Sequence, residues 1–335
     1  MIKLSHHPSL TRRAFSGAAA GVLLWPSLRN MPADAQEFPG GKGIKLVCGS
    51  APGSISDIVG RIVAEQLQAE LGVTVYVENK SGASGIIAAQ SILASPADGH
   101  TLYVTTGAHT TAPLVSKVNY DPVGDFSGVA TLAVVTDALV VPSASGIHSI
   151  ADLINAAKAR PGQLNYASAG LGSASYMSAE KFRLATGVDV VHVPFKGPVP
   201  ALSEIVAGRV DYYIAPLATV LSLIQSGKVR ALAVGSKERT ELLPNVPTLP
   251  ESGVRNAEYL FWVGLLVSSR TSSPLVRKLN EITAKILDRP AVRANFEMLG
   301  VSPLLMTPQQ FDEMMRREMA QYEPIIKAGR EHIWR

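Results

Sequence analysis

Short apolar segments alternate with amphipathic ones along most of this chain, and this alternation is the feature that most restricts its fold. Residues 44–47 are apolar apart from Lys45, and apolar side chains then recur with helical spacing from Ile58 to Leu71, where Gly72 ends the pattern. Strands that alternate with helices predict an α/β fold with parallel, doubly wound sheets, whose ligands lie beyond the carboxyl ends of the strands. The same reasoning predicts further strands at 73–77, 101–105, 164–167, 190–193, 210–214 and 231–234, and helices at 82–93, 149–159, 201–207, 218–225, 274–287, 291–299 and 308–327.

The alternation occurs twice, which predicts two lobes. Apolar segments at 129–141 and 259–267 separate the middle of the chain from the rest. If each segment carries the chain between lobes, lobe 1 is discontinuous and holds residues 36–137 and 263–335, and lobe 2 holds residues 138–262. Two lobes joined by two crossover strands predict a clamshell with a cleft between them.

The first 35 residues have the layout of an export signal. Paired arginines precede an apolar stretch and then Ala33-x-Ala35, which predicts cleavage after Ala35. Arg12 and Arg13 fit the twin-arginine pattern, although an ordinary Sec signal remains an alternative. The chain has 31 basic and 27 acidic side chains, of which the signal holds four and one, so the mature protein carries a net charge of only +1. This balance gives no reason to expect a nucleic-acid partner.

Two loops of similar composition each lie between a predicted strand and a predicted helix. They read "SAPGSISD" from Ser50 and "SAGLGSAS" from Ser168. Backbone N–H groups at a helix N-terminus bind anions without a basic side chain, and serine adds further donors. Glycine and serine are common in any strand-to-helix turn, so ordinary turns remain an alternative, but one such loop in each lobe favours a small anion held from both sides. Asp57 either caps its helix by bonding amides one turn along, which we favour, or orients a ligand.

Other sites of chemistry have little support in the sequence. No lysine follows the glycines as in a phosphate loop, and no G-x-S-x-G or H-E-x-x-H pattern occurs. Cys48 is the only cysteine, lies in a predicted buried strand, and is expected to be a small core residue. His109, in "TTGAHTTAP", is expected in a surface loop, with the cleft as the alternative. We predict no metal and no cofactor.

Ten segments resemble the extracytoplasmic solute receptors of tripartite tricarboxylate transporters, also called Bug receptors. They are "PGSISDIVGRIVAEQL", "VENKSGASG", "PADGHTLYV", "YDPVGDFSGVA", "LNYASAGLGSASYMSAEKF", "VHVPFKG", "GRVDYYIAPL", "GKVRALAVGSKER", "LPNVPTLPESG" and "FWVGLL". They occur in the family's order from about Ile44 to the C-terminus. The resemblance implies a two-lobed, type II-like periplasmic binding protein that holds a small carboxylate by loop amides, hydroxyls and waters.

Family contacts carried over to this chain give a set of expected ligand-binding residues. In lobe 1 they are Pro52, Gly53, Ser54, Ile55, Ser56, Asp57 and Thr106; in lobe 2 they are Ser168, Ala169, Gly172, Ser173, Tyr176, Phe195 and Ala215. The chain departs from the family's usual residues at four of them. Ile55 replaces a small polar residue, Tyr176 a histidine and Phe195 a tyrosine. Ala215 stands where many members have an aspartate that meets a ligand's amino group. These departures suggest an aromatic or apolar carboxylic acid rather than an amino acid.

The resulting expectation is a periplasmic, monomeric, non-enzymatic receptor that closes on its ligand and delivers it to membrane transporter subunits. Two alternatives stay open. The receptor could feed a sensor kinase instead, or the cleft could belong to a secreted hydrolase, for which the sequence offers no nucleophile and base.

Overall fold

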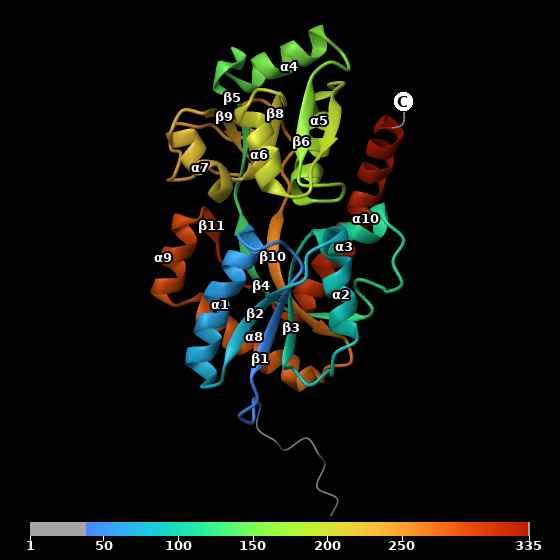
Figure 1. The fold of residues 1–335 in the computed structure, drawn as a ribbon, viewed down its shortest axis with the longest axis vertical. Coiled ribbons are helices and arrows are strands. Elements are labelled where there is room, and N and C mark those ends of the chain that lie inside the picture. The colour runs from blue at the N-terminus through green and yellow to red at the C-terminus, as the bar shows by residue number, and fades with distance from the viewer. Residues whose placement is uncertain (1–37, 334–335) are drawn as a thin grey trace, which may run out of the picture. The chain divides into compact units, whose positions relative to one another are not determined.

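The computed structural model describes residues 38–333, with side chains up to residue 329, and forms there an α/β fold built on two sheets (Figure 1). The predicted signal, its arginine pair and its cleavage site lie outside the described residues. Within the described part, no helix is both long enough and apolar enough to cross a membrane.

The first sheet has six strands in the order β11-β4-β10-β3-β1-β2. Their bounds are β1 Ile44–Cys48, β2 Val75–Asn79, β3 Thr101–Thr106, β4 Phe126–Val135, β10 Phe261–Ser268 and β11 Val301–Ser302. Strands β1, β2 and β3 are parallel, as predicted, but β10 pairs antiparallel with both β3 and β4. The sheet is therefore mixed: its parallel strands β1, β2 and β3 are joined to the antiparallel strand β10.

Helices cover both faces of this sheet, and strand β1 shows why. Ile44, Leu46 and Cys48 belong to one core cluster and Val47 to another, because alternate side chains of a strand face opposite ways. Cys48 is fully buried, as expected for a core residue. The first face carries α1 (Ile55–Leu71) and α8 (Ser273–Leu287), and the second carries α2 (Ile86–Leu93) and the start of α10 (Pro308–Ile333).

The second sheet has five strands in the order β7-β6-β8-β5-β9. Their bounds are β5 Asp137–Pro142, β6 Asn165–Ser168, β7 Val191–Pro194, β8 Tyr212–Pro216 and β9 Val229–Val234. Strands β6, β7 and β8 are parallel, and β5 runs antiparallel to β8 and β9. One face packs on α4 (Ile150–Ala159) and α5 (Ala174–Thr186), the other on α6 (Pro198–Val206) and α7 (Leu217–Gln225).

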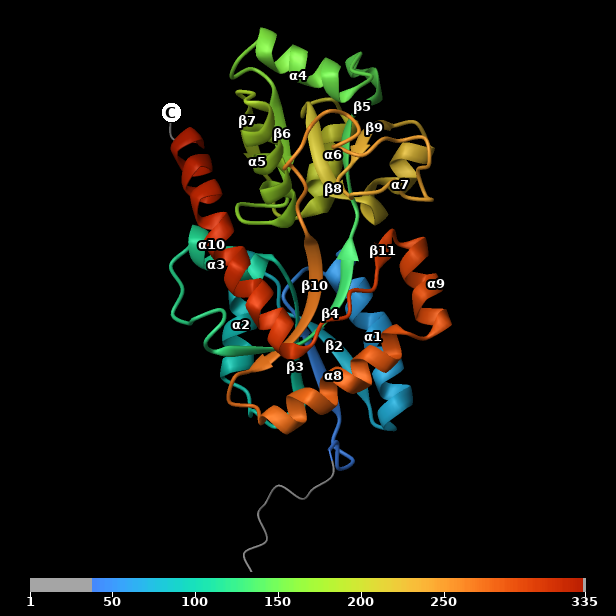
Figure 2. The same cartoon turned by 180° about the vertical axis from the view of Figure 1, so that it is seen from behind.

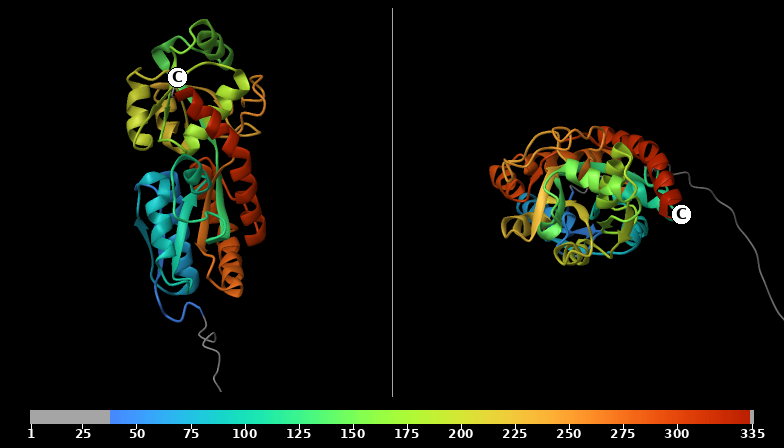
Figure 3. Two further views of the ribbon diagram at one scale, coloured as in Figure 1. Left: turned by 90° about the vertical axis from the view of Figure 1, so that its right-hand side faces the viewer. Right: turned by 90° about the horizontal axis from the view of Figure 1, so that it is seen from above.

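The chain passes between the two sheets twice. It leaves β4 for β5 through Thr136 alone, and it returns from β9 to β10. The predicted lobe boundaries, 137/138 and 262/263, fall one residue inside β5 and two residues inside β10. Helix α10 forms a further link, because it packs on β4 and α3 (Ala108–Val115) of the first sheet's layer and on α5 of the second (Figures 2 and 3).

The sequence pattern missed helix α3 (Ala108–Val115), which contains threonines and Pro113. As a result, the expectation for His109 is wrong. His109 lies on α3 rather than in a surface loop and is 1% exposed, with Nε2 2.7 Å from the carbonyl oxygen of Pro122. Its ring packs edge-on to Phe126 and stacks on Tyr120. Burial lowers the pKa of His109 to about 4, so the ring is neutral near pH 7.

Candidate functional site

A cavity of about 610 Å³ lies where the strands of both sheets end. Its wall is formed by six strand-to-helix turns, three from each sheet. These turns follow β1, β2 and β3 in the first sheet and β6, β7 and β8 in the second. This is the position expected for a ligand in a sheet with parallel strands. The lining residues are Gly49, Ser50, Ala51, Ser54, Ile55, Ser56, Ser81, Gly82, Ala83, Ser84, Gly85, Thr105, Thr106, Ala108, Ala169, Gly170, Ser173, Ala174, Ser175, Lys196, Gly197, Pro198, Tyr213, Pro216, Thr219 and Phe261.

Helix α1 begins at this wall with a serine cap. The N-cap Ser54 has φ −70° and ψ 159°, and its hydroxyl accepts the N–H of Asp57. The hydroxyls of Ser54 and Ser56 lie 3.3 Å apart. Gly53 precedes the cap with φ +77°, a conformation that glycine adopts without strain. The amides of Ile55 and Ser56 have no hydrogen-bond partner among the described residues and border the cavity.

Helix α5 begins in the same way on the other side of the cavity. Its N-cap Ser173 has φ −70° and ψ 161°, and the hydroxyl accepts the N–H of Tyr176. The hydroxyls of Ser173 and Ser175 lie 3.1 Å apart, and Gly172 has φ +75°. The two loops singled out from the sequence therefore have one local structure. Each adds the partial positive charge of a helix start to one wall of the cavity.

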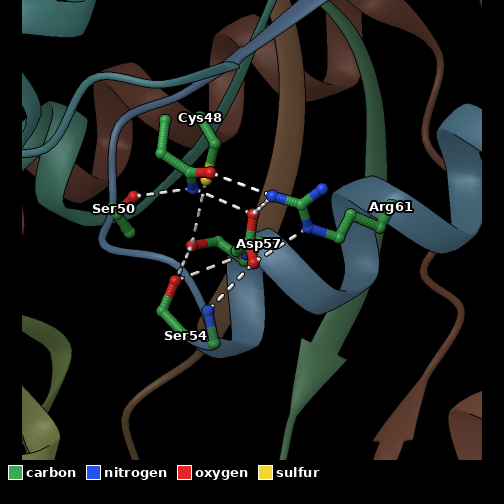
Figure 4. Close-up of polar contacts among 8 residues, drawn as sticks. Cys48, Ser50, Ser54, Asp57 and Arg61 are labelled. Carbon is green, nitrogen blue, oxygen red and sulfur yellow. Dashed lines mark hydrogen bonds and ion pairs between the residues drawn. The ribbon is translucent and has the colours of Figure 1, made fainter. Parts of the chain in front are cut away.

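Asp57 holds the first loop in shape (Figure 4). Its carboxylate accepts the N–H of Gly53 at 2.9 Å, the side-chain amide of Asn79 at 2.8 Å and the guanidinium of Arg61 at about 3 Å. The prediction that Asp57 bonds amides one turn along is wrong in detail, because Ser54 is the cap and Asp57 reaches back to the residue before it. Burial would raise the pKa of Asp57, but Arg61, Gly53 and Asn79 together lower it below its usual value.

We expect Asp57→Asn to lower the free energy of unfolding by about 2 kcal/mol near pH 7, because it weakens several charge-assisted hydrogen bonds at once. The loss should shrink as the pH falls through the lowered pKa, since the wild-type carboxyl then also loses its charge. Asp152→Asn is the matched control, because Asp152 makes the same backward bond to His148 N at the exposed start of α4. Urea denaturation at pH 3 to 8 measures both variants. Equal losses for the two would contradict a special role for Asp57.

The structure places six of the expected ligand-binding residues on the cavity wall and the others behind or beside it. On the wall are Ser54, Ile55, Ser56, Thr106, Ala169 and Ser173. Off the wall are Pro52, Gly53, Asp57, Ser168, Gly172, Tyr176, Phe195 and Ala215. Ile55 is 4% exposed and packs mainly into the core, so it adds little apolar surface to the cavity.

The expected residues off the wall in the second lobe have identifiable surroundings. The Ser168 hydroxyl lies 2.7 Å from Nε2 of His192. Tyr176 is fully buried, with its ring near that of His192. Ala215 is buried in the core under α6 and α7, and Phe195 packs against the same core. The carbonyl of Gly172 accepts the Thr111 hydroxyl at 2.6 Å, which ties the second loop to α3.

Sequence reasoning missed several wall residues that a simple rule would have found. Residues 81–85 follow β2 and Lys196 to Pro198 follow β7, and both segments begin within four residues of the end of a predicted strand. Only the turns after β1 and β6 were predicted to be binding loops. Tyr213 was also missed, and its buried hydroxyl lies beside Ser175 without a well-formed hydrogen bond.

Comparisons with known proteins agree on one family. The family model for the tripartite tricarboxylate transporter family receptor matches residues 59–330. A Pseudomonas UPF0065 protein, from the tcbD-tcbE intergenic region, is 32% identical over 94% of this chain and 93% of its own length. BugT of Bordetella pertussis is 29% identical over 92% of this chain and 96% of its own length.

Solved structures give the same result. A protein from R. palustris solved with adipate superposes with a TM-score of 0.80 at 33% identity, covering 85% of this chain and 96% of its own. MatC from Rhodopseudomonas palustris with bound malate has a TM-score of 0.76 at 30% identity, covering 85% and 98%. Both share the two-lobed fold of periplasmic solute-binding proteins described above.

Proposed function

Because the chain belongs to the tripartite tricarboxylate transporter receptor family, we propose that it binds a small carboxylate in the cavity between its two sheets. The observation that carries the proposal is the pair of equivalent helix starts at Ser54 and Ser173, on opposite walls. Free backbone amides, serine hydroxyls and two helix dipoles favour an anion and leave little to hold a neutral ligand in place. Related receptors were solved with adipate and with malate.

The groups that line the cavity suggest which contacts the carboxylate would make. The carboxylate would accept hydrogen bonds from the amides of Ile55 and Ser56 on one side and of Ala174 and Ser175 on the other. Thr106 and Tyr213 supply further hydroxyl groups. Asp57 acts behind the first loop as a positioning residue. The absence of any acidic side chain from the described wall leaves no partner for a ligand's ammonium group, which argues against an amino acid.

The wider role is also a proposal. The lobes, residues 36–137 with 263–335 and residues 138–262, would close on the ligand because the closed state binds it better. The closed form would then be recognised by a membrane transporter, to which the ligand is delivered. Export to the periplasm rests on the predicted signal in residues 1–35. The receptor would work as a monomer and without a cofactor.

A hydrolase is the competing class. It requires a nucleophile and a base that contact each other at the cavity. The described wall offers serine hydroxyls, but it holds no histidine or carboxylate to activate them. Steady turnover of carboxylate esters by the pure protein would overturn the receptor proposal.

We expect the protein, purified after export and freed of retained ligand by unfolding and refolding, to be stabilised by small carboxylates and not by the matching amides. A ligand at one hundred times its Kd adds about 2.7 kcal/mol to the free energy of unfolding, which moves the melting temperature by several degrees. Thermal-shift screening of paired acids and amides, followed by calorimetry, measures this. Equal stabilisation by acids and amides, or none by any acid, would contradict an anion site at the helix starts.

A further inference from the structure

The second loop, residues 168–175, is held in part by residues of the opposite lobe. The carbonyl of Leu171 accepts the hydroxyl of Ser84 at 3.2 Å. The next carbonyl, that of Gly172, accepts the hydroxyl of Thr111 at 2.6 Å. Both donors belong to the lobe of the first sheet, whereas the loop belongs to the lobe of the second sheet. The two hydrogen bonds therefore join the lobes at a loop that borders the cavity.

The first loop is supported differently, by residues of its own lobe. Asp57 accepts the N–H of Gly53 and is itself fixed by side chains of α1 and β2. Asp57 stands three residues after its helix cap. The equivalent position in the second loop, three residues after Ser173, is occupied by Tyr176, which has no carboxylate. The second loop therefore takes from the opposite lobe a support that the first loop finds nearby.

Ser84 reaches the second loop from a turn with an unusual backbone. The four residues 82–85 have φ values of +131°, +47°, +54° and +90°, although Ala83 and Ser84 are not glycine. Other residues keep such a conformation only where their surroundings hold it. The buried hydroxyl of Tyr103 holds one end of the turn, by donating to the carbonyl of Gly85 at 3.1 Å. The hydrogen bond to the second loop is a further anchor, made by the opposite lobe.

Thr111 acts on the second loop from behind. It lies on α3, is fully buried, and is not among the described residues of the cavity wall. Gly172 packs so closely here that a Cβ on it would lie 3.0 Å from Val115 Cγ2. The Thr111 hydroxyl also lies 3.1 Å from the carbonyl of Gly107 in its own helix. The bond between the lobes can therefore break without leaving this buried donor unpaired.

We infer that Ser84 and Thr111 are positioning residues that orient the second loop from the opposite lobe. This inference rests on the proposed function and goes beyond it, because it says how one half of the anion site is held in shape. A peptide group is planar, so fixing two successive carbonyls also fixes the peptide planes that lead into the cap Ser173. The amides of Ala174 and Ser175 come next in the chain, and their direction depends on these planes.

The decisive variant is Thr111→Val, which keeps the shape of the side chain and removes its hydroxyl. The probe is adipate, or otherwise the acid with the largest shift in the thermal screen. Its Kd, measured by calorimetry, should rise about three- to tenfold, as expected for the loss of one neutral hydrogen bond. In the ligand-free protein, amide hydrogen exchange of a peptide covering residues 169–177 should become several-fold faster. Thr111→Ser keeps the hydroxyl and should restore both values toward those of the wild type.

Thr283→Val is the matched control. Thr283 is also fully buried and donates to a backbone carbonyl, that of Leu279 at 2.7 Å, but this bond lies within α8. Its loss should change neither the Kd nor the exchange of residues 169–177. Ser84→Ala tests the other bond by hydrogen exchange alone, because Ser84 borders the cavity and a change in its Kd would not be specific to the bond.

The outcomes separate this inference from the function on which it rests. If either the Kd or the exchange rate stays at the wild-type value in Thr111→Val, or changes as much in Thr283→Val, the positioning role is overturned and the carboxylate receptor is left intact. If the wild-type protein binds no acid, the proposed function fails and the positioning role with it. Equal melting temperatures without ligand show that the variants fold.

Discussion

Replacing Glu318 with alanine is expected to lower the free energy of unfolding by about 3 kcal/mol or more, whereas Glu318→Gln should change it by less than about 1 kcal/mol at pH 5. Glu318 lies on α10, is 5% exposed, and occupies the layer where α10 crosses from the first sheet toward the second. Alanine would leave the donors around it without partners and open a cavity. Glutamine keeps the shape and the hydrogen-bonding capacity.

The carboxyl group of Glu318 is surrounded by hydrogen-bond donors, and burial raises its pKa against their effect. Both carboxyl oxygens lie 3.0 Å from the indole Nε1 of Trp262, and Oε2 lies 2.7 Å from the Thr110 hydroxyl. That hydroxyl also lies 2.8 Å from the carbonyl of Gly107. The Gly107 carbonyl also accepts the N–H of Thr111 at 3.1 Å, so the Thr110 hydroxyl is free to donate to Glu318. Burial raises the pKa of Glu318 to about 7, against the lowering effects of Thr110, Trp262, Tyr322 and Lys181.

The raised pKa gives a signed pH dependence. The folded state binds more protons at Glu318 than the unfolded state does between pH 4.5 and 7. Stability contributed by this group is therefore lost as the pH rises through that window, by about 3 kcal/mol in total. Glutamine does not titrate, so the Glu318→Gln variant does not lose this stability as the pH rises. The difference between variant and wild-type stability, measured in urea from pH 5 to 8, should grow with pH in favour of the variant.

The wild-type curve alone would not reveal this effect. His109 and His192 have pKa values lowered to about 4 by burial, so their contributions rise with pH over part of the same range. Asp137, whose pKa burial raises to about 6, acts in the same direction as Glu318. Subtracting the curves cancels these groups, which both proteins share. A difference that does not change with pH would contradict a protonated Glu318.

The sequence predicted those parts of the fold that local patterns determine. Strand β1, helix α4 and the glycine end of α1 have the expected places because each depends on neighbouring residues. Strand direction is a different matter. Nothing in the periodicity of residues 261–268 shows that β10 runs antiparallel to β3, since this follows from the route of the chain between two sheets. Helix α3 was missed because buried contacts, and not helix propensity, stabilise it.

The candidate site, like the fold, was predictable only where it depends on residues that are close together in the sequence. The two serine loops could be found because strand, glycine, serine and helix follow one another within each loop. The roles within the first loop could not, because they depend on residues far along the chain. Asp57 turns away from the cavity toward Arg61 and Asn79, and Asn79 is contributed by the end of β2.

Ala51→Asp is expected to reduce carboxylate affinity about a hundredfold or more while leaving the fold intact. Ala51 follows β1, lies on the cavity wall and has an exposed side chain, so a carboxylate fits there without disturbing the core. An aspartate just before α1 also suits the helix dipole, so stability should not fall. The same carboxylate competes for the α1 amides and repels an anionic ligand at close range, which costs several kcal/mol of binding free energy.

Ala51→Asn separates charge from size, because it adds a side chain of nearly the same shape without the negative charge. Its affinity should stay within about fivefold of wild type, and the deficit of Ala51→Asp should shrink as salt screens the repulsion. Calorimetry with one bound acid at low and high salt measures all three proteins. Equal losses for both variants would mean that Ala51 only limits space. No loss for either would place the carboxylate away from the start of α1, because an aspartate beside a bound anion at that helix start must weaken its binding.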